Sequence, residues 1–205
     1  TPNLRGFEDA LAAGADEVAI FGSASEGFSK ANINATIAES LERFRPVAEA
    51  AVADGVPLRG YVSCVVECPY DGVVAPDAVA RVVAALRDMG CYEVSLGDTI
   101  GRATPESIVA MLDAVLQEMP AERLAGHYHD TGGLACDNVE ASLGLGLRVF
   151  DAAVGGLGGC PYAPGAAGNV ATQAVAERVA SLGYEHGLDL DVVAAAAEMA
   201  RRMRG

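Results

Sequence analysis

Two histidines placed two residues apart give the sequence its clearest chemical signal. They lie in the segment His127-Tyr128-His129-Asp130, and alternate side chains of a strand point to the same face. His127 and His129 would therefore converge at one strand end and form a platform for a divalent metal ion. Asp130 is placed to orient one of the rings as an outer partner. The alternative is a pair of histidines that only make hydrogen bonds in the core or at the surface.

A second strand end carries a carboxylate. In the segment Ser95-Leu96-Gly97-Asp98, Ser95 and Gly97 share one face and Asp98 ends the strand. A carboxylate at that place accepts a proton or binds substrate. The alternative is an aspartate that caps the turn after the strand.

A third expected strand is polar on one face. Arg59, Tyr61 and Ser63 alternate there, so their side chains either line a site or face water. Cys64 and Cys68, just beyond, have the wrong spacing for a zinc knuckle, and we expect them to pack in the core.

A loop rich in glycine and proline surrounds a single cysteine. Residues 155–165 read Gly-Gly-Leu-Gly-Gly-Cys-Pro-Tyr-Ala-Pro-Gly, with Cys160 at the centre. Glycines let the backbone approach a ligand closely and prolines stiffen a loop tip, which is typical of a loop that closes over a site. The alternative is a glycine-rich turn with an inert thiol. Asn169, after the loop, either caps a helix or binds a hard cation through its side-chain carbonyl.

Short strand patterns alternate with helical ones along the chain, which positions these residues at strand ends. The expected strands are Glu17–Phe21, Leu58–Val65, Glu93–Asp98, Leu124–Asp130 and Val149–Val154. Helical patterns cover residues 32–53, 77–89, 135–145, 169–182 and 190–203, with another starting at Thr104. Pro46 should kink or split the first helix, and residues 22–34 begin as a polar loop. Repeated β-α units predict parallel strands joined by right-handed crossovers, so the fold class is α/β.

Glycine spacing favours a (β/α)8 TIM barrel over a doubly wound nucleotide-binding sheet. The pair Gly144 and Gly146 is followed at the third glycine position by Val149, and the pair Gly156 and Gly158 by Pro161. Neither completes the G-x-G-x-x-G turn. A barrel needs eight strands, whereas five are visible together with a strand tail at residues 1–3. We therefore expect residues 1–205 to form a single partial barrel domain that lacks the first two or three β-α units.

Charge and cysteine content exclude several classes of protein. The chain has 14 basic and 28 acidic residues, a net charge of −14, which repels nucleic acid and anionic membrane surfaces. The long uncharged segment 152–176 is broken by glycines and prolines and is no transmembrane helix. Five scattered cysteines predict reduced thiols in a cytoplasmic or mitochondrial matrix protein.

Taken together, these segments resemble the 3-hydroxy-3-methylglutaryl-CoA (HMG-CoA) lyase family. The resemblance runs through nearly the whole chain and is carried by residues 21–28, 30–34, 59–64, 68–70, 95–101, 127–131, 156–165 and 168–169. The cysteine loop is the most specific of these motifs.

The resemblance implies a (β/α)8 barrel that binds a divalent cation, Mg²⁺ or Mn²⁺. His127, His129 and Asn169 match three of the family's metal ligands. The fourth, an aspartate beside an arginine on the first barrel strand, has no counterpart in this chain. Cys160 matches the family's essential loop cysteine, and Asp98 matches a strand-end carboxylate implicated in proton transfer.

The implied reaction is cleavage of HMG-CoA to acetyl-CoA and acetoacetate. The metal would lower the pKa of the substrate's 3-hydroxyl, His127 or Asp98 would remove its proton, and Cys160 would protonate the enolate carbon. We also expect a homodimer, and contacts with the acyl-CoA substrate from Ser95, Tyr61 and Asn34.

Three other interpretations remain open or are disfavoured. Synthases of the isopropylmalate or homocitrate type share the His-x-His strand but not the cysteine loop. Biotin-dependent carboxyltransferases and Schiff-base aldolases need a lysine inside the barrel, whereas the single lysine, Lys30, follows a strand in a loop. A non-enzymatic interpretation is an inactive fragment, and an open parallel sheet would expose edges through which this chain associates.

Overall fold

The computed structural model describes residues 1–158 and 168–203. Its centre is a parallel sheet of five strands in the order β1-β2-β5-β6-β7. These are β1 (Val18–Ser23), β2 (Leu58–Ser63), β5 (Glu93–Asp98), β6 (Leu124–Tyr128) and β7 (Val149–Asp151). Every neighbouring pair is parallel, so the predicted α/β class is confirmed.

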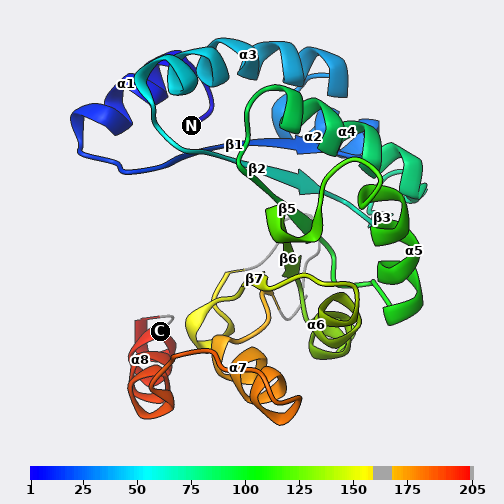
Figure 1. Ribbon diagram of the computed structural model, residues 1–205, viewed down its shortest axis with the longest axis vertical. Helices are drawn as coiled ribbons and strands as arrows, with labels where there is room; N and C mark the ends of the chain where they lie inside the picture. The colour runs from blue at the N-terminus through cyan, green and yellow to red at the C-terminus, as the bar shows by residue number, and fades with distance from the viewer. Residues whose placement is uncertain (159–167, 204–205) are drawn as a thin grey trace.

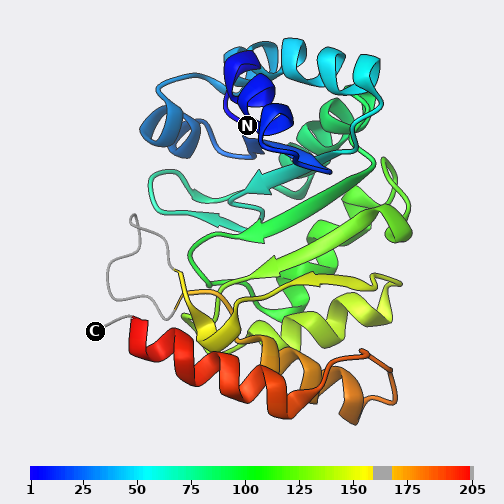
Figure 2. The ribbon, with the colours of Figure 1, turned by 90° about the vertical axis from the view of Figure 1, so that its left-hand side faces the viewer.

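Helices cover one face of this sheet. They are α1 (Leu4–Ala12), α2 (Glu26–Ile33), α3 (Ile37–Asp54), α4 (Pro76–Asp88), α5 (Pro105–Val115), α6 (Ala135–Gly144), α7 (Thr172–Ser181) and α8 (Leu190–Met203). Figure 1 shows α3, α4, α5, α6 and α7 as an arc around the outside of the row of strands, whereas α8 lies beside α7 and η2. Figure 2 looks onto the opposite face, which no helix of the described part covers.

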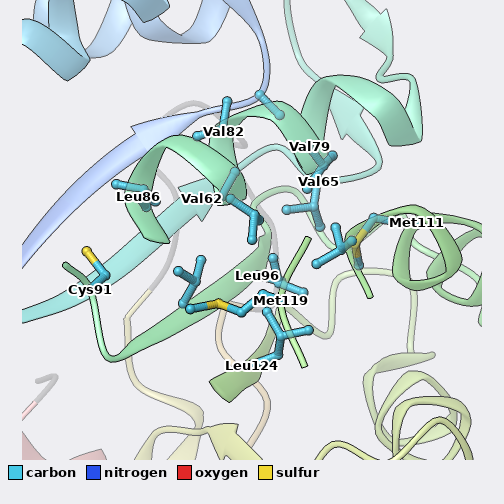
Figure 3. Packing of buried hydrophobic residues seen from close by; sticks show 14 of the residues in the cluster. Val62, Val65, Val79, Val82, Leu86, Cys91, Leu96, Met111, Met119 and Leu124 are labelled. Carbon is cyan, nitrogen blue, oxygen red and sulfur yellow. The ribbon is translucent and has the colours of Figure 1, made fainter. Parts of the chain in front are cut away.

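The hydrophobic core lies between the strands and the arc of helices. Figure 3 shows Val62 of β2 beneath Val82 and Leu86 of α4, and Leu96 of β5 beside Met119. All five side chains are almost fully buried. A Cβ at Gly60 would lie 3.1 Å from the Leu86 side chain, so the absence of a side chain lets α4 approach β2 closely. The alternating pattern of β2 thus buries one face and leaves Arg59, Tyr61 and Ser63 half-buried on the other.

Two expectations about the first helices differ from the structure, namely the loop at residues 22–34 and the split at Pro46. Residues 26–33 form α2 instead of a loop, because the Ser25 hydroxyl accepts the Phe28 N–H at 3.2 Å and caps the helix. Helix α3 begins at Ile37 and continues past Pro46 without splitting, since Phe44, Val47 and Ala48 on its buried face hold it against the core. The predicted N-cap at Thr104 is confirmed, and it accepts the Ser107 N–H.

The last two strands are shorter than expected. β6 ends at Tyr128 because the next residue, His129, forms an isolated antiparallel bridge with Asn169 instead of continuing the parallel ladder. β7 ends at Asp151 and gives way to a short 3-10 turn, η2 (Val154–Gly156). A two-stranded hairpin, β3 (Glu67–Cys68) with β4 (Gly72–Val73), follows β2.

The outer strands of the sheet each have one partner strand in the described part of the chain. β1 pairs only with β2, and β7 pairs only with β6. Beside β1, the Thr1 amino group donates to the Ala19 carbonyl at 2.6 Å, although residues 1–3 form no strand. None of the described helices has the length and apolar character needed to span a membrane.

Candidate metal and active site

The uncovered face of the sheet brings together side chains from four strands. Strand register places Tyr61 of β2 beside Ser95 of β5, and His127 of β6 beside Asp151 of β7. The His127 ring lies edge-on to the Tyr61 ring, with centroids 6.3 Å apart. Three of the predicted site residues therefore meet on one face.

The two histidines converge as the alternation predicts. Their ring centroids are 5.6 Å apart with an angle of 44° between the planes. His129 also pairs through its backbone with Asn169, whose side-chain nitrogen donates to the Leu157 carbonyl at 2.9 Å. This hydrogen bond fixes the amide so that its oxygen stays available as an acceptor.

The chemistry of these three side chains fits a divalent cation. Nδ1 of His129 is buried and makes no well-formed hydrogen bond within the described residues. Burial lowers the pKa of His129, the neighbouring His127 lowers it further, and contacts with Asn169 and Thr99 offset part of this. A neutral imidazole is the form that binds a metal. No cluster of three His, Cys, Asp or Glu side chains able to hold a metal occurs in the described part, so the donors here are the two imidazoles and the Asn169 amide.

A carboxylate that the sequence analysis did not single out anchors this face. Asp151 accepts the Ser95 hydroxyl at 2.7 Å, lies 3.2 Å from His127 Nδ1 and accepts two N–H groups of Arg59 at 2.9 and 3.2 Å. Burial alone would raise the pKa of Asp151, but the hydrogen bonds from His127, Arg59 and Ser95 lower it to about 2. The carboxylate is therefore ionised at neutral pH.

The basic partner of Asp151 is itself held from two other sides. Nε of Arg59 donates to Glu93 at 2.7 Å, and Nη1 donates to the Tyr61 hydroxyl. Burial raises the pKa of Tyr61, so the phenol stays protonated. The polar face of β2 thus lines a site instead of facing water.

The carboxylate beside the histidines is therefore not Asp130. That residue accepts the Ala135 N–H at 3.1 Å and caps the start of α6. The prediction that Asp130 orients a ring was wrong, because its position beyond the strand directs it towards the following helix. Asp151, and its pairing with Arg59, were missed because the two residues lie 92 residues apart and only strand register joins them.

Asp98 occupies the turn-capping position. It follows the buried Leu96 on the helix-facing side of β5 and is only 1% exposed. Its two oxygens accept the N–H groups of Arg102 at 3.2 Å and Ala103 at 2.9 Å. Burial raises the pKa of Asp98, and these backbone hydrogen bonds offset part of the rise. A direct role in proton transfer stays a prediction.

Of the remaining two predicted residues, only Asn34 belongs to the described part of the chain. Asn34 is exposed at the end of α2, in the left-handed conformation, and its carbonyl accepts Arg43 at 3.3 Å. Its hydrogen bonds within the described residues do not reach Tyr61 or Ser95. Cys160 lies outside the described residues. Cys64 and Cys68 are buried, as expected of packing residues.

Comparison with known proteins adds an independent line of evidence. The chain is 55% identical to the mitochondrial hydroxymethylglutaryl-CoA lyase of Arabidopsis thaliana over 205 residues, 100% of this chain and 44% of that protein. The structure of HMG-CoA lyase from Brucella melitensis superposes with a TM-score of 0.97 and 64% identity, over 99% of this chain and 72% of that one.

A third relative was solved with ligands. It is an HMG-CoA lyase from Acenitobacter baumannii in complex with coenzyme A and 3-methylmalate, with a TM-score of 0.89 and 35% identity over 96% of this chain and 64% of that one. The chain spans 44% and 64% of the lengths of the first two curated relatives it matches. The close superposition confirms that its sheet and helices have the arrangement of part of an HMG-CoA lyase barrel.

The profile of the HMGL-like family matches residues 1–200. That match covers nearly the whole chain, including the strands that carry Tyr61, Ser95, His127 and Asp151. The chain therefore belongs to the HMGL-like family.

Proposed function

We propose that the protein to which this chain belongs cleaves HMG-CoA to acetyl-CoA and acetoacetate with the help of a divalent cation. The observation that carries the proposal is the convergence of His127, His129 and Asn169 at the open end of a sheet whose family members are named HMG-CoA lyases. In this proposal residues 1–205 are one partial barrel domain.

The three converging side chains are the proposed metal ligands. A cation bound there, Mg²⁺ or Mn²⁺, would act as a Lewis acid towards the substrate's hydroxyl and carboxylate oxygens. Two imidazoles and one amide oxygen leave room in the coordination shell for oxygens from other groups.

The chain's own residues bind the substrate and move protons. Tyr61 and Ser95 line the floor beside the histidines, where they exclude water from the reacting carbons. Of the two candidate bases, His127 is accessible, with 30% of its side chain exposed, whereas Asp98 is 1% exposed and faces the helices. Nδ1 of His127 faces Asp151, so a His127 that binds the cation through its other nitrogen has no lone pair left for a proton. The assignment of the base to His127 or to Asp98 therefore stays open.

Two parts of the proposal rest on the resemblance. Cys160 would protonate the enolate carbon after the carbon–carbon bond breaks, and Asn34 would contact the acyl-CoA. The acyl-CoA substrate class is also supported by the relative solved with coenzyme A and 3-methylmalate. The assay below distinguishes HMG-CoA from a substrate with a longer branch at carbon 3.

Assembly and location complete the proposal. We expect a homodimer, and α8 carries exposed Val192, Met199 and Met203 at spacings of seven and four residues, which is an apolar stripe on one helix face. The described cysteines form no disulfide, which supports a reducing compartment, the cytoplasm or the mitochondrial matrix.

The decisive experiment measures acetoacetate release from HMG-CoA by the complete natural protein with Mn²⁺ or Mg²⁺. We expect turnover that chelation by EDTA abolishes and that metal restores. Cleavage of a longer 3-hydroxyacyl-CoA in preference to HMG-CoA would correct the substrate. A folded, metal-loaded protein that releases no acetoacetate from either compound would refute the lyase proposal.

A further inference from the structure

The half-buried carboxylate of Asp151 has no task in the proposed reaction. It lies at the end of β7 with 21% of its side chain exposed. Its hydrogen bonds come from three other strands: Arg59 of β2, Ser95 of β5 and His127 of β6. A side chain held from three directions has a single orientation, so it can transmit that orientation to its partners.

The donors on Asp151 are distributed unevenly between its two oxygens. Oδ1 accepts Arg59 Nη2 at 2.9 Å. Oδ2 accepts the Ser95 hydroxyl at 2.7 Å and Arg59 Nη1 at 3.2 Å, and it is the oxygen that lies 3.2 Å from His127 Nδ1. Arg59 and Ser95 thus fix the plane of the carboxylate and present one of its oxygens to the histidine.

This contact decides where the hydrogen of a neutral His127 lies. An ionised carboxylate only accepts hydrogen bonds, so Nδ1 has to be the donor. The lone pair of the neutral ring is then on Nε2, because a neutral imidazole has one N–H and one acceptor nitrogen. Nε2 is thereby the nitrogen left free to bind a cation or a proton.

We propose that Asp151 is a positioning residue that holds His127 in the Nδ1–H tautomer and fixes its ring, with Arg59 and Ser95 holding Asp151 in turn. The use of this arrangement, to aim Nε2 at the cation site, rests on the proposed function. The tautomer itself does not, since it follows from contacts within the chain. Outer partners of this kind change metal affinity by about 10–100-fold when they are removed.

The first test needs no substitution. The complete natural protein, free of metal and labelled with ¹⁵N, is studied by NMR about two pH units above the ordinary histidine pKa of about 6.5. Long-range correlations between ring nitrogens and carbon-bound hydrogens identify the tautomer of each histidine. We expect His127 as the Nδ1–H form, and finding the Nε2–H form would overturn the proposal.

The second test compares two substitutions around Arg59. Asp151→Asn keeps the side-chain shape but allows an amide N–H to face His127, so we expect a shift towards the Nε2–H form and about 10–100-fold weaker Mn²⁺ binding by calorimetry. Glu93→Gln is the matched control, because Glu93 also binds Arg59 without contacting His127. We expect it to change neither the tautomer nor Mn²⁺ affinity by more than about two-fold.

The outcomes separate the two proposals. Equal effects of both substitutions would show that Asp151 acts only through the general stability of the face, and would overturn the positioning role. If Asp151→Asn does not fold, the wild-type tautomer still decides. A shifted tautomer and weakened Mn²⁺ binding in a protein that does not cleave HMG-CoA would keep the positioning role and refute the lyase. Normal cleavage of HMG-CoA by a protein whose His127 is the Nε2–H tautomer would support the lyase and refute the positioning role of Asp151.

Discussion

At the scale of single residues, the chemistry of the site depends on which strand face a side chain occupies. His127 and Tyr61 lie on the uncovered face and meet there, whereas Asp98 lies one step out of that alternation and is engaged by backbone N–H groups. A side chain on the uncovered face is thus open to a ligand, whereas Asp98, on the other face at the end of β5, is buried in the turn. Substitutions on the uncovered face should therefore affect ligand binding, whereas substitution of Asp98 should affect stability.

His129→Ala should remove Mn²⁺ binding while leaving the fold intact. Nδ1 of His129 is buried without a well-formed hydrogen bond within the described residues, so the substitution leaves no partner of that nitrogen unpaired. Loss of an outer partner lowers metal affinity by about 10–100-fold. We expect loss of His129, a direct ligand, to lower the Mn²⁺ affinity measured by calorimetry by more than this. His186→Ala is the matched control, since that half-buried ring lies in the segment between α7 and α8 and its Nδ1 accepts the Leu188 N–H. Equal losses in both variants would contradict the assignment.

Asp98→Asn should act mainly on stability. An amide oxygen replaces two carboxylate oxygens, so one of the N–H groups of Arg102 and Ala103 loses its partner in a buried place. We expect the free energy of unfolding at neutral pH to fall by about 1–3 kcal/mol in urea titrations. Arg102→Ala is the control, because it keeps the backbone N–H that donates to Asp98 and should leave the stability nearly unchanged. Turnover lost at unchanged stability would instead support the proton-transfer role.

The stability difference between wild type and Asp98→Asn should depend on pH, and its direction follows from the pKa of Asp98. Burial raises the pKa of Asp98 in the folded state, so above the ordinary aspartate pKa the folded state binds more protons than the unfolded state. The contribution of Asp98 to stability is then full below the unfolded pKa and decreases as pH rises through the folded pKa. The stability of wild type minus that of Asp98→Asn should therefore fall with rising pH from about pH 4. A rise over that range would show that the hydrogen bonds outweigh burial.

At the scale of elements, local signals predict where strands and helices are, and long-range contacts decide their ends. The cap at Thr104 is read directly from the sequence and is confirmed. Helix α3 passes through Pro46 although a proline within a helix removes a hydrogen bond, because Phe44 and Val47 are buried against the core. That burial depends on β1, which the local pattern around Pro46 does not encode. β6 likewise ends early because of Asn169, forty residues further along the chain from His129.

Pro46→Ala should stabilise the protein. Pro46 is exposed in the interior of α3, where alanine restores an N–H and is favoured by up to about 3 kcal/mol, while the freer unfolded chain offsets about 1 kcal/mol. We expect the free energy of unfolding to rise by about 1–2 kcal/mol. Pro105→Ala, at the first turn of α5, should change it little because the missing N–H has no partner there. A neutral or destabilising Pro46→Ala would show that the proline holds a bend that packing requires.

At the scale of the whole molecule, the barrel class follows from alternation and glycine spacing, but the site does not follow from any one motif. The network from Glu93 through Arg59 to Asp151 joins three strands that are neighbours only in space. The His-x-His segment is predicted because both residues lie on one strand. The partner of His127 is not predicted, because the choice between Asp130 and Asp151 depends on where β6 ends and which strand pairs with it.

The outer strands of the sheet govern how the 205-residue chain behaves alone. In the described part, β1 and β7 each pair on one side only, and an unpaired strand edge is a template for another chain. We expect this chain to associate in size-exclusion chromatography with light scattering. Val149→Lys, on β7, should reduce the associated fraction, because Val149 is 38% exposed and a lysine on an edge strand disfavours pairing. Val192→Lys, on the exposed face of α8, is the matched control for association through that helix. A monodisperse monomer, or an effect of Val192→Lys alone, would exclude the edge of β7 as the associating surface.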